Sequence, residues 1–516
     1  MIRGEAVGMR EKDHKVWQAL RRIISLLFIV SAVWIWIIGF WSGVEKYHIL
    51  FGAISLVCMA GVLWFGWLAG QKRRQMPDQR RGGPAVQGQR RVLAVAVPAL
   101  IGFAGMLFVA LAVRNDVVDN WDYGLVFQNA AAIATGRGAS FDLDYFARYG
   151  NNALFLRLLA FFLGIIYRVT GREDIYFLLN CSIVFNCILV ILSILLCSAA
   201  VTKVCSPREG LLTRIILLLM APFYLYATFT YSDVYGLLPC AVFLLGIGKA
   251  CANGKEGSRS VWTGLAAAAG VIAFLIKGTA VIYVLAGFFC VCFGKEFGEK
   301  RIRLLVIYIA AAAAAYFCLS LTNNLFLKRY GVTAQLQEEK AFPADHFLMM
   351  AMNPETAGQY HYPDVEYTMS FPGKENKKKA DREELAQRLR RMGAAGTLQH
   401  MFIKKAKYIY GTGTAGAPSY IVRKPLQENG AVRFFGGNKH FFAAALLYKL
   451  LLEGWIIAVS ILHLVRKKEE NALVLLAKIS WIGMFLFFCI WESHPRYTFI
   501  FLPLIGILAV QYSGKR

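Results

Sequence analysis

The sequence predicts an all-α membrane protein with about twelve membrane-spanning helices, and three observations support this fold class. Hydrophobic residues make up 57% of the chain and charged residues 17%, whereas a soluble domain carries about 25% charged residues. The apolar residues form continuous blocks near the ~20 residues that a helix needs to cross a hydrocarbon core ~30 Å thick. Strands of a membrane barrel would instead show short alternating segments. Helices are therefore the expected membrane-spanning elements.

The apolar blocks and the stretches between them divide the chain into four parts. The expected spans are residues 22–41, 49–70, 92–113, 176–200, 211–229, 236–252, 261–276, 279–294, 303–322, 441–464, 472–491 and 497–512. Residues 1–91 hold the amino-terminal segment, two helices and a basic loop. Residues 92–322 form a core of spans, 323–440 form a polar segment large enough for a small domain, and 441–516 hold the last helices.

Much of the net charge of +25 comes from lysines and arginines in short loops beside the apolar blocks. Such loops stay on the cytoplasmic side, so the charge predicts orientation and not a nucleic-acid partner. We expect a multi-pass protein of the plasma membrane, with both termini, the 71–91 loop and the 295–303 loop in the cytoplasm. Segments 114–152 and 323–440 then lie outside. Within the second, the lysine run 377–379 is typical of a solvated helix face.

The apolar block 153–170 is predicted to lie along the outer membrane surface. Charge counts from the two ends of the chain agree only if this block does not cross the membrane. It also contains Arg157 and Arg168, which are costly on a lipid-facing span. The alternative is an ordinary additional span.

The cysteine pattern indicates neither a disulfide framework nor a zinc site. The 11 cysteines lie in apolar blocks or at their edges, with none in 114–152 or 323–440, and no CxxC pair occurs. The sequence also lacks a Walker loop, a Rossmann glycine pattern and an HExxH motif, so an ATP-driven pump is not expected. No cofactor is predicted; a divalent metal is compatible with the acidic residues but is not indicated by their spacing.

Two stretches of the first outer segment contain candidate site residues. Asp119 and Asp122 follow directly after a membrane exit, where a carboxylate could serve as a general base. The alternative is a solvated loop or a helix cap, since Asp often caps helices. Tyr149, Asn151 and Asn152 lie in an aromatic stretch that suits either an interface belt or a binding role.

Ionisable residues also occur at three breaks between apolar blocks. Lys277 interrupts the apolar run 271–293, and a lysine at membrane depth is usually functional, for example as a point charge for phosphate. Simple snorkelling at a helix end is the alternative. Arg496 could bind phosphate in a bidentate manner or pair with Glu492. Asp233 lies in a short polar corner that needs no function.

Four short motifs occur on one predicted side of the membrane, in a fixed order: Asp122-x-Gly124, Tyr145-Phe146-x-x-Tyr149-x-Asn151-Asn152, Lys277-Gly278, and Glu492 followed by Arg496-Tyr497. Together they resemble motifs of the GT-C fold membrane glycosyltransferases, the class that contains protein O-mannosyltransferases and the lipid A aminoarabinose transferase. The resemblance covers about 92–322 and, more weakly, 441–512. Tyr123 stands where many members have a second acidic residue, which weakens the argument for a metal.

The resemblance implies a seven-helix core over 92–322, a juxtamembrane helix in the first outer loop and a large outer loop. It implies an inverting transfer of sugar from a polyprenyl-phosphate donor in the membrane to a glycan, lipid or protein acceptor. Asp122 would be the catalytic base, and Lys277 and Arg496 would bind the donor phosphate. The residues expected to bind or orient the substrates are Asp119, Tyr149, Asn151, Asn152, Asp233 and Glu492.

Two other functions fit parts of the pattern. A polysaccharide polymerase or ligase that uses lipid-linked glycan would also have a one-sided site, and it is the second expectation. A lipid or glycan transporter would need polar groups at mid-membrane on paired broken helices. Here the ionisable groups cluster at one predicted face, which favours an enzyme. The sequence names neither the sugar nor the acceptor.

Overall fold

The computed structural model describes residues 2–72, 84–118, 121–138, 141–252, 256–468 and 470–511 of the 516-residue chain. Within these residues the regular secondary structure is helical, and one isolated bridge pairs Asn115 with Pro425. The predicted all-α class is therefore confirmed. Asp119, one of the predicted substrate-binding residues, lies outside the described residues.

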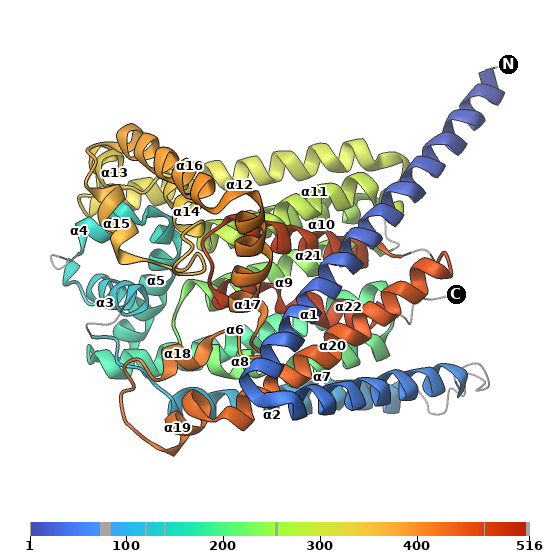
Figure 1. The fold of residues 1–516 in the computed structure, drawn as a ribbon, viewed down its shortest axis with the longest axis horizontal. Helices are drawn as coiled ribbons and strands as arrows, with labels where there is room; N and C mark the ends of the chain where they lie inside the picture. Colours follow the sequence, from blue (N-terminus) through green and yellow to red (C-terminus); the bar gives the residue numbers. More distant parts are fainter. Residues whose placement is uncertain are drawn as a thin grey trace.

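The long helices run side by side in a bundle whose long axis is horizontal in Figure 1. The bundle contains α1 (Ile2–Lys72), α2 (Pro84–Ala112), α6 (Ile175–Val204), α7 (Pro207–Leu218), α8 (Ala221–Tyr226), α9 (Ser232–Cys251), α10 (Glu256–Ile276), α11 (Val281–Phe293), α12 (Arg301–Arg329), α20 (Lys439–Val465), α21 (Ala472–Ile490) and α22 (Leu502–Ala509). The 3-10 helices η3 (Gly278–Ala280), η4 (Lys295–Lys300) and η6 (Pro495–Phe501) precede α11, α12 and α22.

Nine helices in the described part of the chain are long and apolar enough to cross a membrane. α1 carries the first two predicted spans as two helices that meet at His48, where a φ of 68° and a ψ of 171° interrupt the helical path. The block 211–229 is divided between α7 and α8, and the blocks 279–294 and 497–512 correspond to shorter apolar helices. The count of about twelve crossings therefore stays a prediction.

The segments predicted to lie outside gather at one end of the bundle, and both chain termini lie at the other end (Figure 1). At the end with the termini, the Arg21 side chain donates a 2.7 Å hydrogen bond to the Phe293 carbonyl. The Arg301 guanidinium lies 4.9 Å from the centre of the Trp17 ring. The basic segments near residues 20 and 300 thus lie together, as expected for loops on one side of the membrane.

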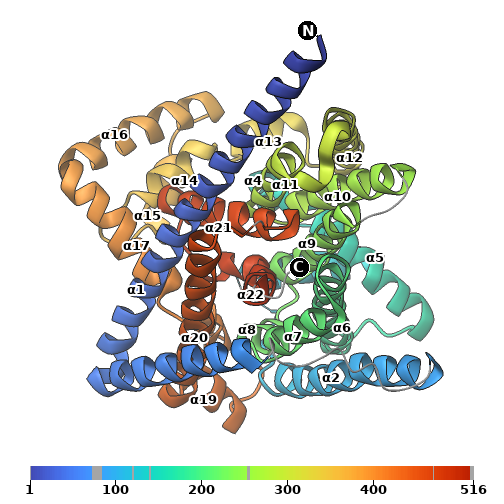
Figure 2. The same cartoon turned by 90° about the vertical axis from the view of Figure 1, so that its right-hand side faces the viewer.

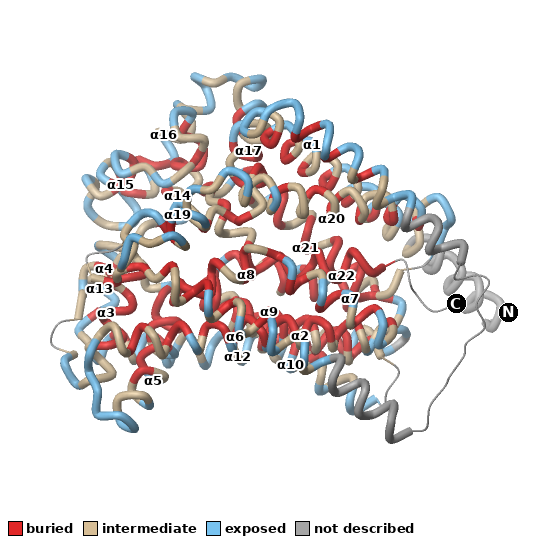
Figure 3. The backbone as a smooth tube through the Cα atoms, turned by 90° about the horizontal axis from the view of Figure 1, so that it is seen from below, coloured by how far each residue is buried: buried red, intermediate tan, exposed pale blue. Residues whose placement is uncertain are grey.

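The first outer segment forms α3 (Asp122–Ala134), α4 (Leu143–Arg148), η2 (Gly150–Asn152) and α5 (Ala153–Thr170). α5 is long and apolar enough to span a membrane, yet it runs across the end of the bundle and not along it (Figures 2 and 3). Its Arg157 donates hydrogen bonds to Thr322 and Asn323 near the end of α12. This transverse position is what an interfacial helix requires, and the interfacial placement of α5 remains our prediction.

The segment after α12 folds into a helical cap over the same end of the bundle (Figure 1). The cap contains α13 (Ala334–Lys340), α14 (Ala344–Ala351), α15 (Tyr362–Met369), α16 (Lys374–Gln399), a π-helical turn (His400–Lys404), α17 (Lys405–Tyr410), α18 (Ala417–Ile421) and α19 (Gly430–Gly437). The cap and the first outer segment are therefore neighbours in space although they lie far apart in the sequence.

Buried residues are concentrated where the bundle helices meet (Figure 3). α9 and α10 approach closely at Gly246, where an added Cβ would lie only 2.8 Å from the Ala266 Cβ. Small residues of this kind allow membrane helices to pack tightly. The Phe501 ring of η6 stacks on Tyr283 of α11 at 5.2 Å between centroids. This packing fixes η6, and η6 carries Arg496.

Candidate active site

Two cations from distant parts of the chain meet at one buried carboxylate. Lys277 lies at the break between α10 and η3, Arg496 lies on η6, and Asp233 lies in the first turn of α9. The Lys277 Nζ is 2.9 Å from Asp233 Oδ1, and the Arg496 Nε is 3.2 Å from Asp233 Oδ2. The Asp233 side chain is 0% exposed, so its charge depends on these two partners. One carboxylate thus contacts two cations that come from distant segments.

Asp122 is joined to this cationic pair through a tyrosine. The Tyr231 hydroxyl donates a 3.1 Å hydrogen bond to Asp122 Oδ2 and accepts a 3.5 Å bond from Arg496 Nη2. The Arg496 guanidinium also lies 4.3 Å from the centre of the Tyr231 ring, a cation–π distance. Burial raises the pKa of Tyr231 well above its ordinary value, so its hydroxyl keeps the proton that it donates to Asp122. Asp122 begins α3 and is only partly buried.

Glu492 lies in the linker between α21 and η6, close to both charge types. Burial raises the pKa of its carboxyl to about 7, while Arg496 and Lys277 act in the opposite direction and Asp122 adds to the rise. The next residue, Ser493, donates its backbone N–H to the Gly358 carbonyl of the cap at 2.7 Å. Glu492 is therefore a carboxyl that can change its charge near neutral pH.

His494 and Tyr420 contact each other, and both also contact Arg496. The backbone N–H of Arg496 donates to His494 Nδ1 at 3.0 Å, so Nδ1 is the accepting nitrogen. Nε2 then carries the hydrogen and donates to the Tyr420 hydroxyl at 2.7 Å. Burial, together with Arg496 and Lys277, holds the pKa of His494 well below its ordinary value and keeps the ring neutral. The neutral ring positions the start of η6 without adding charge.

The stretch before α5 contributes further aromatic side chains. Asn152 is buried and donates a 2.8 Å hydrogen bond to the Tyr145 hydroxyl. The Tyr149 ring lies between Tyr145 and Phe342, at 5.0 and 5.7 Å between centroids. Burial raises the pKa of Tyr149, and the nearby carboxylates of Asp122 and Glu492 raise it further. Asn151 is exposed, and its side chain does not share the burial of Asn152.

An apolar cavity of about 340 Å³ lies beside η6. Thr498 and Phe501 line it from η6, and the Gly-rich turn that contains Thr412, Gly413 and Ala415 lines it from the cap side. The remaining wall comes mainly from α8, α20 and α22. The cavity thus extends between bundle helices from the segment that carries Arg496.

The part of the chain covered by the structure contains no group of three or more His, Cys, Asp or Glu side chains arranged to hold a metal ion. The carboxylates of the site instead face cations and tyrosine hydroxyls. These contacts suit the binding of an anion more than that of a cation.

Comparison with known families places the chain among membrane proteins. Residues 85–515 match the protein family described as "Conserved hypothetical integral membrane protein". The chain belongs to this family. The match begins at α2 and includes the cap and the whole candidate site. The chain is therefore an integral membrane protein, and the family description names no activity. A comparison with curated proteins finds no match.

Two solved structures have a similar chain path. One is ArnT from Cupriavidus metallidurans bound to undecaprenyl phosphate, with 17% identity and a TM-score of 0.32 over 81% of this chain and 77% of that chain. The other is an Archaeoglobus fulgidus oligosaccharyltransferase complex with Zn and sulfate, with 14% identity and a TM-score of 0.31 over 80% and 53% of the two chains. At these TM-scores the likeness assigns no activity.

The structure brings most of the predicted site residues to one place and adds others. The residues it groups are Asp122, Tyr149, Asn152, Asp233, Lys277, Glu492 and Arg496. Tyr231, Tyr420 and His494 were not predicted, although all three contact the group. A tyrosine beside an apolar block more often belongs to the interface belt, so its side chain alone gives no signal of a site.

Proposed function

We propose that the protein is an inverting glycosyltransferase that moves a sugar from a polyprenyl-phosphate donor to an acceptor on the outer side of the plasma membrane. The observation that supports this most is the placement of Asp122 beside two cations at one end of an apolar helical bundle. That end is opposite the chain termini and the basic segments (Figure 1), and positive segments mark the cytoplasmic side.

The two cations suit a lipid phosphate. Arg496 offers a planar fork and Lys277 a compact charge, and both contact Asp233. Burial lowers the pKa of Lys277 to about 8, while Asp233 acts to raise it, so Asp233 helps to keep the ammonium charged. A phosphate that entered would accept hydrogen bonds from both cations. The apolar cavity beside η6 gives the attached lipid chain a path between the helices.

Asp122 would act as the general base. The acceptor hydroxyl attacks the anomeric carbon of the sugar and forms the new glycosidic bond, while its proton passes to Asp122. The bond between the anomeric carbon and the phosphate oxygen breaks, and its electron pair stays on the phosphate. Lys277 and Arg496 would stabilise the charge that develops there. Attack on the face opposite the phosphate inverts the anomeric carbon, by analogy with inverting glycosidases.

The remaining residues would hold these groups in place. Asp233 fixes both cations, and Tyr231 orients the Asp122 carboxylate. Tyr149 and Glu492 are near enough to Asp122 for its charge to raise their pKa values, and they would contact the sugar or the acceptor. The cap and α5 lie at the same end of the bundle as these residues, which makes them the parts that would select the acceptor.

The test replaces Asp122 in cells that lack their own copy of the protein. In cells with Asp122→Asn, we expect a sugar–polyprenyl phosphate to accumulate in lipid extracts and one sugar to be missing from an envelope glycan, lipid or protein, as measured by mass spectrometry. Transfer should fall by about 10²–10⁴-fold, the usual contribution of general base catalysis.

Asp116→Asn is the matched control for this test. Asp116 lies in the same outer segment, and its carboxylate is 3.9 Å from Lys424, away from the cations of the site. This variant should behave like wild type. Wild-type glycans in the Asp122→Asn cells would refute the proposed function. Accumulation of a lipid-linked glycan chain in place of a single sugar would favour a polysaccharide polymerase or ligase.

A further inference from the structure

A small polar cavity lies between the first turns of α10 and α12, and its volume is about 250 Å³. The candidate active site lies past the other end of α10, where Ile276 precedes Lys277. Because α10 has 21 residues, the two places are about 30 Å apart along the helix. The described residues that line the cavity are Glu256, Arg259, Ser260, Lys300, Arg303 and Leu304. Three of the four charged side chains in this lining are cations.

One carboxylate connects two of these cations across the cavity. Glu256 Oε1 accepts a 2.7 Å hydrogen bond from Arg303 Nη1, and Glu256 Oε2 pairs with the Lys300 ammonium. The Lys300 and Arg303 side chains are 56% and 63% exposed, so a ligand can reach both of them. An ammonium has three donor hydrogens and a guanidinium has five, so both cations keep donors for a second acceptor.

Arg259 and Ser260 add polar atoms to the wall that α10 contributes. The Arg259 Nε and the Ser260 Oγ are buried, and neither has a hydrogen-bond partner within the part of the chain that the structure describes. Buried polar atoms of folded proteins nearly always have a partner, so these two indicate a ligand. The first turns of α10 and α12 also present backbone N–H groups, which favour an anion.

The place of the cavity at the edge of the bundle indicates that this anion belongs to a lipid. Figure 2 shows α10 and α12 at the edge, and α12 has the smallest buried share among the candidate spans of the described chain, at 11%. Val306 and Ala310 follow Arg303 at i+3 and i+7 on one face of α12, and both are exposed. An exposed apolar face therefore begins directly beside the cations. A free phosphate ion would make no use of that face.

We propose that the cavity binds the phosphate headgroup of an anionic phospholipid, taken from the leaflet at the end of the bundle that holds the chain termini. Lys300 and Arg303 contact the phosphate oxygens, and Arg259 and Ser260 donate from the α10 wall. The acyl chains lie along the exposed face of α12. Basic pockets between membrane helices on the cytoplasmic side bind such headgroups, and we predict that this end is cytoplasmic. The inference does not depend on the proposed glycosyl transfer.

The experiment measures lipid binding by the purified full-length protein in detergent. Phosphatidylglycerol, phosphatidylcholine and inorganic phosphate are titrated separately, with native mass spectrometry and the melting temperature as readouts. Wild type should bind phosphatidylglycerol about tenfold more tightly than phosphatidylcholine, whose headgroup carries an ammonium that the cations repel. Inorganic phosphate at the same concentration should not displace phosphatidylglycerol, because it lacks the acyl chains.

Two variants and a control locate the site. The double variant Lys300→Gln, Arg303→Gln should bind phosphatidylglycerol about tenfold more weakly and phosphatidylcholine as wild type does. Arg259→Gln should also weaken phosphatidylglycerol binding, and it leaves the pairs of Glu256 intact. The control removes two exposed cations that follow α20 and do not line the cavity, as Arg466→Gln with Lys467→Gln, and it should bind as wild type does.

Three results would overturn the inference. One is wild-type phosphatidylglycerol binding by the Lys300 and Arg303 double variant. Another is an equal loss in the Arg466 and Lys467 control, which would indicate general surface charge and no defined site. The third is displacement of phosphatidylglycerol by an equal concentration of inorganic phosphate, which would indicate a site for a free anion.

Discussion

Two buried charge groups lie at the same end of the molecule, and their charge ratios are opposite. In the bundle, the single carboxylate of Asp233 faces the two cations Lys277 and Arg496. In the cap, the single guanidinium of Arg388 faces the two carboxylates of Asp364 and Glu384. The carboxylates of Asp233 and Asp364 are both shielded from solvent, and the first group is joined through Tyr231 to the partly exposed Asp122.

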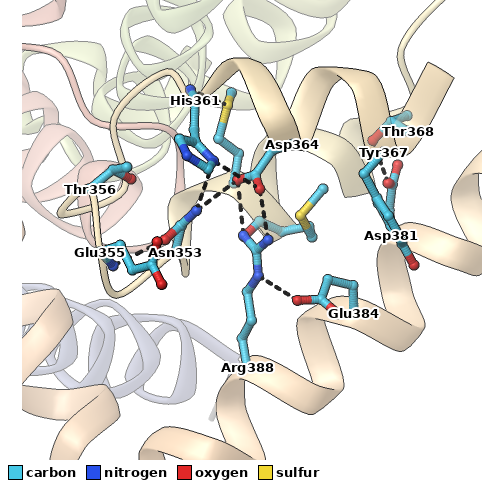
Figure 4. Close-up of polar contacts among 12 residues, drawn as sticks. Asn353, Glu355, Thr356, His361, Asp364, Tyr367, Thr368, Asp381, Glu384 and Arg388 are labelled. Carbon is cyan, nitrogen blue, oxygen red and sulfur yellow. Dashed lines mark hydrogen bonds and ion pairs between the residues drawn. The ribbon is translucent and has the colours of Figure 1, made fainter. Parts of the chain in front are cut away.

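The two groups are suited to different roles. In the Arg388 group, each nitrogen of the guanidinium donates a hydrogen bond to an acceptor within the cap (Figure 4). Nothing about that group calls for a ligand. The Asp233 group brings two cations from distant segments together and is joined to Asp122 through Tyr231, which is why we propose it as the site of the donor phosphate. This comparison is the reason that we propose phosphate binding for the bundle group and a structural role for the cap group.

The largest expected effect comes from removing the Asp233 carboxylate. Asp233→Asn leaves two like charges buried side by side, which should cost about 3–5 kcal/mol of stability, the range for breaking a buried ion pair. Without Asp233 the pKa of Lys277 should fall further below its value of about 8, so the ammonium loses charge at neutral pH. Both the melting temperature of the purified protein and the rate of sugar transfer should fall.

Asp364→Asn provides the contrasting variant. It should lower the melting temperature by about as much as Asp233→Asn does, because Arg388 loses its bidentate partner. It should leave the donor dependence of transfer unchanged, since the cap group does not touch the cations. A donor defect in Asp364→Asn equal to that of Asp233→Asn would erase the distinction between the two groups.

The residues of the two charge groups were not equally predictable from the sequence, for physical reasons. Lys277 and Arg496 stand out because a charge beside apolar blocks is costly and therefore informative. Asp233 looked like a polar turn, and its role depends on a contact between segments far apart in the chain. The pair of Asp364 and Arg388 gave no signal, because isolated charges in a polar segment are usually solvated.

One expectation for the cap was wrong at a single residue. The lysine run 377–379 was expected on a solvated face, and Lys379 is exposed, but Lys377 is buried and donates to the Glu339 carbonyl at 2.5 Å. Its long apolar stem packs inside while its ammonium finds a carbonyl, which a run of like residues does not reveal. The bundle was predictable because its hydropathy pattern repeats over whole helices, whereas the packing of the cap depends on single side chains.

A smaller, pH-dependent effect tests the burial of Glu492 near the Asp233 group. Burial raises the pKa of its carboxyl from the ordinary value of 4.5 to about 7. The folded protein thus holds an extra proton between these values, so the free energy of unfolding should fall as the pH rises from about 4.5 to about 7. Melting curves across this range should show the slope for wild type and a weaker slope for Glu492→Gln. Identical slopes would contradict the buried position of this carboxyl.

The most direct measurement of the central claim is the stabilisation of the purified protein by undecaprenyl phosphate, with undecaprenol as the lipid that lacks the phosphate. Wild type and Asp122→Asn should both melt at a higher temperature with the phosphate lipid, because Asp122 acts on the acceptor. Lys277→Ala should lose most of this shift, since it removes one of the two cations that face Asp233. A Lys277→Ala protein stabilised as strongly as wild type, or equal stabilisation by undecaprenol, would contradict a lipid-phosphate site at this end of the bundle.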